Sequence, residues 1–207
     1  RGVTFRMPAP LANRFRHINM EVNFEDWQQW AVNNNIHSEV VGYLSYAKQD
    51  LFDFDPKTSS QAFATPRSWS YVSEILNVPG FAEADRKEQL VELAGAIGEG
   101  MAIKFNEHRK IASDLPNPTD ILNGKVKELN SKVAKEISAK YSLVVGLAYE
   151  INEAYKEAGS VDKDMGVMLN HMIRFAFNNF EPEMVIFSLK TLMKDYKIVF
   201  NFRKVLD

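Results

Sequence analysis

Apolar residues recur at helical spacing along most of the second half of the chain, and no other feature constrains the fold as strongly. The first run keeps a near-heptad spacing and consists of Val133, Ile137, Tyr141, Val144, Ala148, Ile151 and Tyr155. A second run, rich in methionine, consists of Met165, Met168, Leu169, Met172, Ile173 and Ala176. Runs of this kind are typical of helices packed in a bundle. The sequence therefore predicts a mainly α-helical chain.

The first part of the chain combines a strand pattern with helix-start signals. Residues 14–22 alternate, so that Ile18, Met20 and Val22 share one face of a predicted strand. Asn23 and Ser38 then stand where each is a favourable N-cap for a following helix. We therefore expect one leading β-strand followed by short helices.

A Pro79-Gly80 step is the clearest break in the chain and suggests two domains, residues 1–79 and residues 80–207. Beyond it, the spacing predicts one long helix that runs from Leu90 to Phe105. That stretch contains three poor helix formers, Gly95, Gly98 and Gly100. We interpret these glycines as places where another helix or backbone approaches closely.

The start of a further helix places an arginine where anions bind. Thr65 is a plausible N-cap and Pro66 suits the first helical position. Arg67 therefore lies in the first turn, where free N–H groups and the helix dipole favour negative charge. Arg67 is either a phosphate contact or an arginine that only covers its own helix start.

Two short motifs resemble AAA+ ATPases of the MoxR-like and dynein-related branch. They are the stretch Pro10-Leu11-Ala12-Asn13-Arg14-Phe15 and the stretch Thr65-Pro66-Arg67-Ser68-Trp69. The resemblance extends through residues 94–100 and the Leu115-Pro116-Asn117-Pro118 turn to about Leu122, and is weak beyond it. It implies that residues 1–79 form the end of the ATPase core and its lid, followed by a helical extension. It also implies that Arg14 is an arginine finger acting on a neighbouring subunit and that Arg67 is sensor 2.

The parts that bind the nucleotide in AAA+ proteins are absent from this sequence. No G-x-x-x-x-G-K-[ST] loop and no acidic Walker-B strand occur. We therefore expect a C-terminal region whose longer parent protein binds ATP and Mg²⁺, with neither bound to this chain alone. The resemblance implies that the parent forms a ring and couples ATP hydrolysis to remodelling of a protein client, which the sequence does not identify.

Other candidate sites in the sequence carry weaker signals. His37 precedes a predicted helix and is either a contact to adenine or ribose or a solvated turn residue. Asp50, Asp53 and Asp55 lack the glycine and terminal glutamate of a calcium loop, and Phe52 and Phe54 between them are expected to plug into the core. The four histidines have no metal-ligand spacing, so no metal site is expected.

Composition excludes several function classes and leaves one rival. The net charge is −2 without a clustered basic stretch, which argues against a nucleic-acid partner. No apolar run approaches a membrane span, and cysteine is absent. These features suggest a cytoplasmic protein with no membrane partner. The alternative to the ATPase is a non-enzymatic helical interaction module that docks a partner through its Met-rich half.

Overall fold

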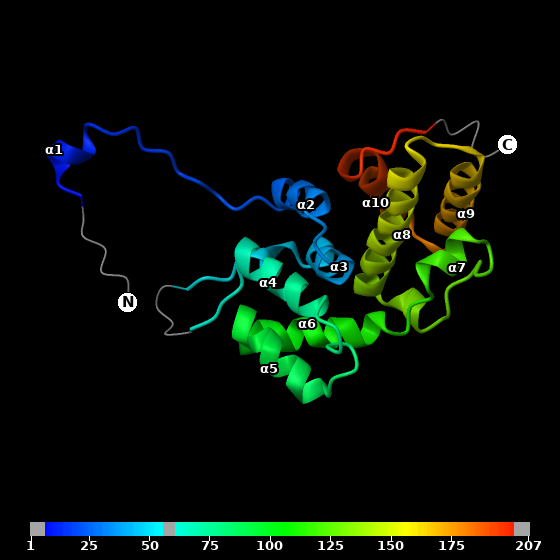
Figure 1. Ribbon diagram of the computed structural model, residues 1–207, viewed down its shortest axis with the longest axis horizontal. Helices are drawn as coiled ribbons and strands as arrows, with labels where there is room; N and C mark the ends of the chain where they lie inside the picture. Colours follow the sequence, from blue (N-terminus) through cyan, green and yellow to red (C-terminus); the bar gives the residue numbers. More distant parts are fainter. Residues whose placement is uncertain (1–6, 56–60, 201–207) are drawn as a thin grey trace.

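The computed structural model describes residues 7–55 and 61–200, and within these ranges it is mainly α-helical, as predicted (Figure 1). The helices in chain order are α1 (Ala9–Ala12), α2 (Phe24–Asn33), α3 (Ser38–Tyr46), η1 (Lys48–Leu51), α4 (Pro66–Leu76), α5 (Arg86–Ile97), α6 (Glu99–Ala112), α7 (Pro118–Leu122), η2 (Val133–Lys135), α8 (Ile137–Ala158), α9 (Lys163–Asn179), α10 (Pro182–Lys190) and η3 (Thr191–Asp195). The last of these, η3, is a π-helical turn. Among the helices of these residues, none has the length and apolar character that a membrane crossing requires.

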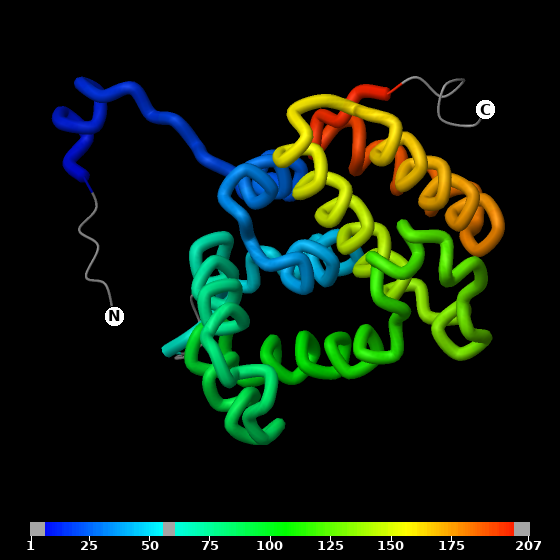
Figure 2. The backbone as a smooth tube through the Cα atoms, turned by 45° about the vertical axis from the view of Figure 1, so that its right-hand side comes forward, coloured from blue at the N-terminus to red at the C-terminus, as the bar shows by residue number. Residues whose placement is uncertain are grey.

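Residues 7–23 form an arm that extends away from the helical body, residues 24–55 and 61–200 (Figures 1 and 2). The predicted strand at residues 14–22 is not formed, and residues 16–22 make no backbone hydrogen bond within the described chain. A strand needs a second strand to satisfy its backbone groups, and the described residues supply none. The residues predicted to share one strand face, Ile18, Met20 and Val22, are exposed instead.

Helices α2 to α6 form the first region of the body around a core of aromatic side chains. Trp69 and Phe105 are fully buried with their rings 5.4 Å apart, and Tyr43 packs against both. Edge-on and tilted aromatic contacts of this kind add to the gain from burying apolar area. Trp27 is also buried, whereas Trp30 lies 44% exposed at the surface. The helix that carries Arg67 contributes Trp69 and Val72 to this core, and both are fully buried.

The predicted long helix from Leu90 to Phe105 is divided into α5 and α6 at Gly98. Gly98 has φ +84°, and a Cβ built there would lie 2.7 Å from the carbonyl oxygen of Ala62. Only glycine fits both the backbone angle and the contact. The prediction of a close approach is therefore confirmed at Gly98, whereas nothing lies within 4 Å of a Cβ built at Gly95 or Gly100.

Helix α8 joins the first region to the second, which consists of α7 to η3 (Figure 2). Val145 of α8 belongs to the first core, while Leu147 and Ile151 belong to the second. The first core reaches from Phe24 to Phe105, so the Pro79-Gly80 break is a turn between two helices that pack together, α4 and α5. The boundary between the two cores therefore lies between α6 and α7 and not between residues 79 and 80. The turn at residues 79 and 80 separates two helices, but both helices contribute to the same core.

Candidate functional site

The start of α4 has the geometry that its sequence predicts. Thr65 is the N-cap, and its Oγ1 accepts a hydrogen bond of 3.0 Å from the Ser68 N–H. The Ser68 hydroxyl accepts a bond of 2.7 Å from the Thr65 N–H, which completes a capping box, and Pro66 follows the cap. These bonds fix the first turn rigidly. Arg67 is therefore held at the second helical position by a well-defined local structure.

The Arg67 side chain is exposed and unengaged. It makes no ion pair or side-chain hydrogen bond with any other part of the chain that the structure describes. It lines an open cavity of about 540 Å³ together with Phe63, Tyr71 and Gly95. An unpaired guanidinium at a helix start, beside open space and aromatic rings, is able to take an anion from another molecule.

The loop before α4 carries an aromatic group at the surface. The rings of Phe54 and Phe63 lie 4.8 Å apart, and Phe52 packs against Phe54. Phe52 and Phe54 are 46% and 48% exposed, so the prediction that they plug into the core is wrong. Leu51, the residue before Phe52, is buried instead.

The three aspartates of this loop do not form a metal site. Asp50 is buried, accepts a 2.5 Å hydrogen bond from Tyr43 Oη, and lies 3.6 Å from Lys104 Nζ. The Asp50 carbonyl oxygen accepts a further bond from the Trp69 indole. Asp50 therefore holds the first core together, and the described residues contain no group of three acidic or histidine side chains that could hold a metal ion.

Arg14 lies on the arm, directly after α1, and is exposed. Like Arg67, it has no ion pair or side-chain hydrogen bond within the described residues. Figures 1 and 2 both show α1 far from α4, so the structure does not bring the two arginines together. Figures 1 and 2 show the arm extending away from the body, so the described body does not hold Arg14 in place.

His37 is half-buried and caps α3. Its ring Nδ1 accepts a 3.3 Å hydrogen bond from the backbone N–H of Glu39, and its backbone N–H donates to Ser73 Oγ at 2.9 Å. Burial lowers the pKa of His37 below its ordinary value, against the opposing effect of Glu39. His37 therefore replaces the predicted Ser38 as the N-cap, and it is not among the residues that line the Arg67 cavity.

In contrast to Arg67 and Arg14, Arg109 of α6 has hydrogen-bond partners within the fold. Its Nε donates to Glu39 at 2.5 Å, its Nη1 donates to Gln89 at 2.9 Å, and it lies 5.4 Å above the Phe81 ring. This cluster joins α3, α5 and α6. This cluster could not be predicted from sequence spacing, because Glu39 and Arg109 are 70 residues apart. The only signal in the sequence is the helix face on which each residue lies.

The neighbouring His108 pairs with Ser142 across α6 and α8. The two side chains lie 2.8 Å apart from Nε2 to Oγ, while His108 Nδ1 has no partner in the described chain. Burial lowers the pKa of His108 to about 4, so the ring is neutral at neutral pH. A hydrolytic triad needs an acid on Nδ1. Because none is present among the described residues, the pair is a structural tie between two helices.

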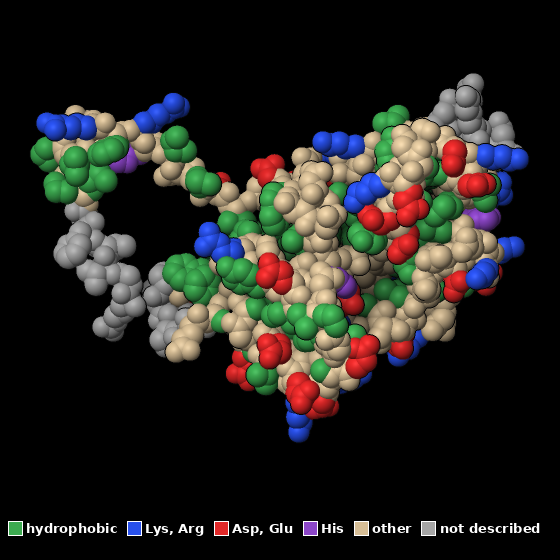
Figure 3. Space-filling model, in the orientation of Figure 1, with side chains coloured by type: hydrophobic (Ala, Val, Ile, Leu, Met, Phe, Trp, Pro, Cys, Tyr) green, Lys and Arg blue, Asp and Glu red, His purple; other side chains and the backbone are tan. Residues whose placement is uncertain are grey.

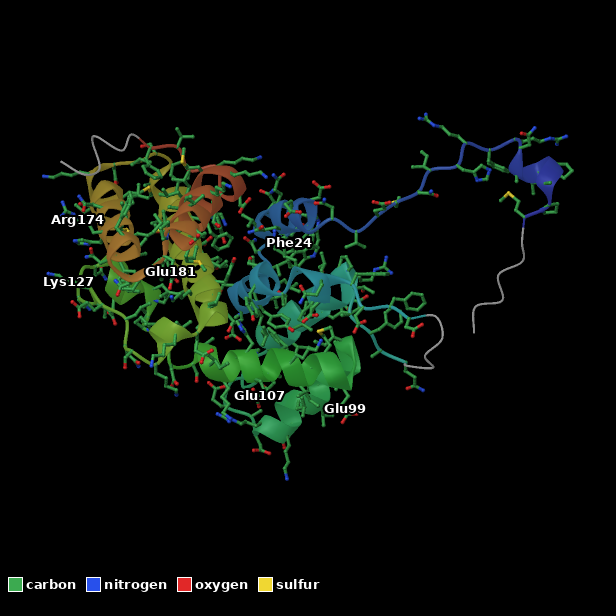
Figure 4. The ribbon with its side chains drawn as sticks, turned by 180° about the vertical axis from the view of Figure 1, so that it is seen from behind. Phe24, Glu99, Glu107, Lys127, Arg174 and Glu181 are labelled. Atoms are coloured by element: carbon green, nitrogen blue, oxygen red, sulfur yellow. The ribbon has the colours of Figure 1, made fainter. Side chains whose placement is uncertain are left out.

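Figures 3 and 4 show the molecule from opposite sides. Hydrophobic side chains lie uncovered along the arm in Figure 3, and in Figure 4 Glu99 marks the start of α6, with Glu107 farther along the same helix. No family model, no curated protein and no solved structure matches the chain.

Proposed function

We propose that this chain is the lid-bearing C-terminal region of a AAA+ ATPase of the MoxR-like type. The observation that carries the proposal is Arg67, an exposed and unpaired arginine in the first turn of α4, beside a cavity of about 540 Å³. The Thr65-Pro66-Arg67 motif that resembles sensor 2 coincides with this rigid helix start.

The residues around Arg67 fit the terminal phosphate of a nucleotide and not the whole of it. A guanidinium offers two parallel donors to phosphate oxygens, and the helix start adds a favourable field. Nothing in the described chain fits Mg²⁺, since no suitable cluster of ligands exists there. In this proposal ATP and Mg²⁺ are bound by the Walker motifs of the parent protein, and Arg67 contacts the γ-phosphate of the same subunit.

The arm supports the second half of the proposal. Arg14 has no partner within the described residues, and the exposed side chains of Ile18, Met20 and Val22 are suited to packing as the last strand of an ATPase core. In a ring of subunits Arg14 then reaches the nucleotide of the neighbour and stabilises the charge that develops during phosphoryl transfer. The parent uses this cycle to remodel a protein client, in the cytoplasm and without a nucleic-acid or membrane partner.

The test compares two arginines of similar placement in the parent ATPase. Arg86 is also exposed, also unpaired within the described residues, and also follows a capping residue, Asp85, at the start of α5. Arg67→Ala should reduce kcat/KM for ATP about ten- to hundredfold, the range of a lost charge-assisted bond. Arg86→Ala should leave it unchanged. Equal effects of the two substitutions would remove the sensor assignment.

One observation favours a second candidate, a non-enzymatic interaction module. The arm exposes apolar side chains, with Met20 95% exposed and Ile18 71% exposed, and such a segment also suits a protein partner. The Met-rich helix α9 is a weaker docking surface, because Met165 and Met172 are buried in the second core. A Walker-A motif in the reading frame upstream of residue 1 supports the ATPase, and its absence there supports the module.

A further inference from the structure

A cavity of about 300 Å³ lies where α2 and η1 of the first region meet α8, α10 and η3 of the second. Figures 1 and 4 show α2 beside α10, and Phe24 is the first residue of α2. Its apolar wall includes Phe24 and the ring pair of Tyr141 and Phe187, whose centroids are 4.7 Å apart. The cavity is therefore built by both regions and has a defined aromatic wall.

The buried side chains of this cavity include polar groups that the fold leaves without partners. Gln28 is 6% exposed and Thr191 is 1% exposed. Within the described chain, neither Gln28 Nε2 nor Thr191 Oγ1 has a hydrogen-bond partner. Unsatisfied buried polar groups are destabilising and uncommon in native proteins. Both residues line the same cavity, so a ligand bound there is able to supply the missing hydrogen bonds.

A carboxyl group in the same cavity also lacks a counterion. Asp195 is half-buried and forms no ion pair with the rest of the described chain. Burial raises the pKa of Asp195 to about 6, against the opposing effect of Lys194. Of the three lysines that line the cavity, Lys48 is paired with Glu25 at 2.7 Å and lies over the Phe24 ring, whereas Lys190 and Lys194 are exposed to solvent. The cavity thus holds a carboxyl group for which a bound cation is a favourable partner.

The backbone at this point is also unusual. Thr191 and Asp195 are the first and last residues of the π-helical turn, closed by a hydrogen bond from the Tyr196 N–H to the Thr191 carbonyl oxygen at 3.1 Å. π-Helical turns interrupt the regular hydrogen bonding of an α-helix, are rare, and occur often at functional sites. Here the turn places a hydroxyl group and a carboxyl group on one cavity.

We propose that this cavity binds a small primary amine with a hydrogen-bond acceptor next to the amino group. The ammonium group pairs with Asp195 and donates to Thr191 Oγ1, the acceptor takes the free N–H of Gln28, and the apolar part packs on Tyr141 and Phe187. Free amino acids and the N-terminal residue of a peptide share this chemistry. Because both regions line the cavity, an occupant stabilises the α2–η3 seam.

The test uses the 207-residue chain, with leucinamide as the probe and N-acetyl-leucinamide as its uncharged match. We expect leucinamide to raise the melting temperature and to give a saturable calorimetric titration, and the acetylated form to do neither. Free leucine and the tripeptide Leu-Gly-Gly then distinguish the sources, because binding of leucine alone indicates a free amino acid and binding of the tripeptide indicates a peptide N-terminus.

Three substitutions in the cavity and one control on α9 separate binding from stability. Asp195→Asn should abolish the leucinamide response, whereas Asp164→Asn on the exposed face of α9 should leave it unchanged. Thr191→Val and Gln28→Leu should raise the melting temperature of the free chain while weakening leucinamide binding at least tenfold. The proposal is overturned if no amine binds, if the acetylated form binds equally, or if Asp195→Asn binds as the native chain does.

Discussion

The arm and the helical body carry one candidate arginine each, but the chain positions only one of them. Arg67 stands on a capped helix whose next turn is anchored by the fully buried Trp69. Arg14 stands on an arm whose residues 7–23 are exposed almost throughout. A side chain acts at a fixed place only when its backbone has a fixed position. The described body therefore fixes the position of Arg67 and does not fix that of Arg14.

The largest effect that distinguishes the arm from the body concerns stability. Trp69→Ala removes a fully buried indole and its bond to Asp50, and should cost about 3–5 kcal/mol of unfolding free energy. Met20→Ser, on the arm, should change it by less than about 0.5 kcal/mol. Urea denaturation followed by tryptophan fluorescence and circular dichroism measures both. A loss above about 1 kcal/mol for Met20→Ser would show that the arm packs on the body.

At acidic pH we expect a smaller loss of stability, because His108 is buried in its neutral form. Its pKa is about 4 in the folded chain, below the value of about 6.5 for an unfolded chain. The unfolded chain therefore binds this proton first. The contribution of neutral His108 is complete above pH 6.5 and is lost as the pH falls towards 4, by a total on the order of 3 kcal/mol.

The matched measurement is the same pH series on His108→Gln. Asp195 titrates in an overlapping range with the opposite sign, since its pKa is raised to about 6 in the folded chain. The difference between the two series isolates His108. If the native chain and His108→Gln lose stability in parallel between pH 6.5 and 4, His108 is not buried as a neutral ring.

The packing of α3 against α8, which joins the two regions of the body, is tested by substituting Gly42, with Gly95 as the control. A Cβ at Gly42 of α3 would lie 2.6 Å from Ser142 Oγ and 2.8 Å from Ser142 Cα on α8, so Gly42→Ala should cost about 1–3 kcal/mol. A Cβ at Gly95 of α5 meets nothing within 4 Å, so Gly95→Ala should stabilise the chain by about 0.5–1 kcal/mol. Thermal denaturation gives the two signs, and equal signs would contradict the α3–α8 packing.

Local features of the fold could be predicted from the sequence, whereas long-range ones could not. Caps depend on residues three apart, so Asn23 and Thr65 were identified correctly, and each accepts the predicted backbone hydrogen bond. The strand at residues 14–22 was predicted from alternation alone, and alternation does not show whether a pairing partner is present.

The same limit applies to the candidate site. Arg67 could be found because its position follows from the helix start beside it. The Arg109 cluster could not, because its partners Glu39 and Gln89 come from two other helices. The cavity of Gln28, Thr191 and Asp195 was missed for a further reason: its signal is the absence of bonds, and only a packed structure reveals that absence.

The central claim is that Arg14 and Arg67 serve different nucleotides, one in the neighbouring subunit and one in the same subunit. The most direct test of this proposal measures ATP hydrolysis by the proposed full-length parent after mixing Arg14→Ala subunits with subunits that lack the lysine of its proposed phosphate loop. Each variant alone should lose activity, by about a thousandfold or more for Arg14→Ala. The mixture should recover part of it, because an intact finger then meets an intact nucleotide site across an interface. A mixture that assembles and stays inactive would contradict the claim.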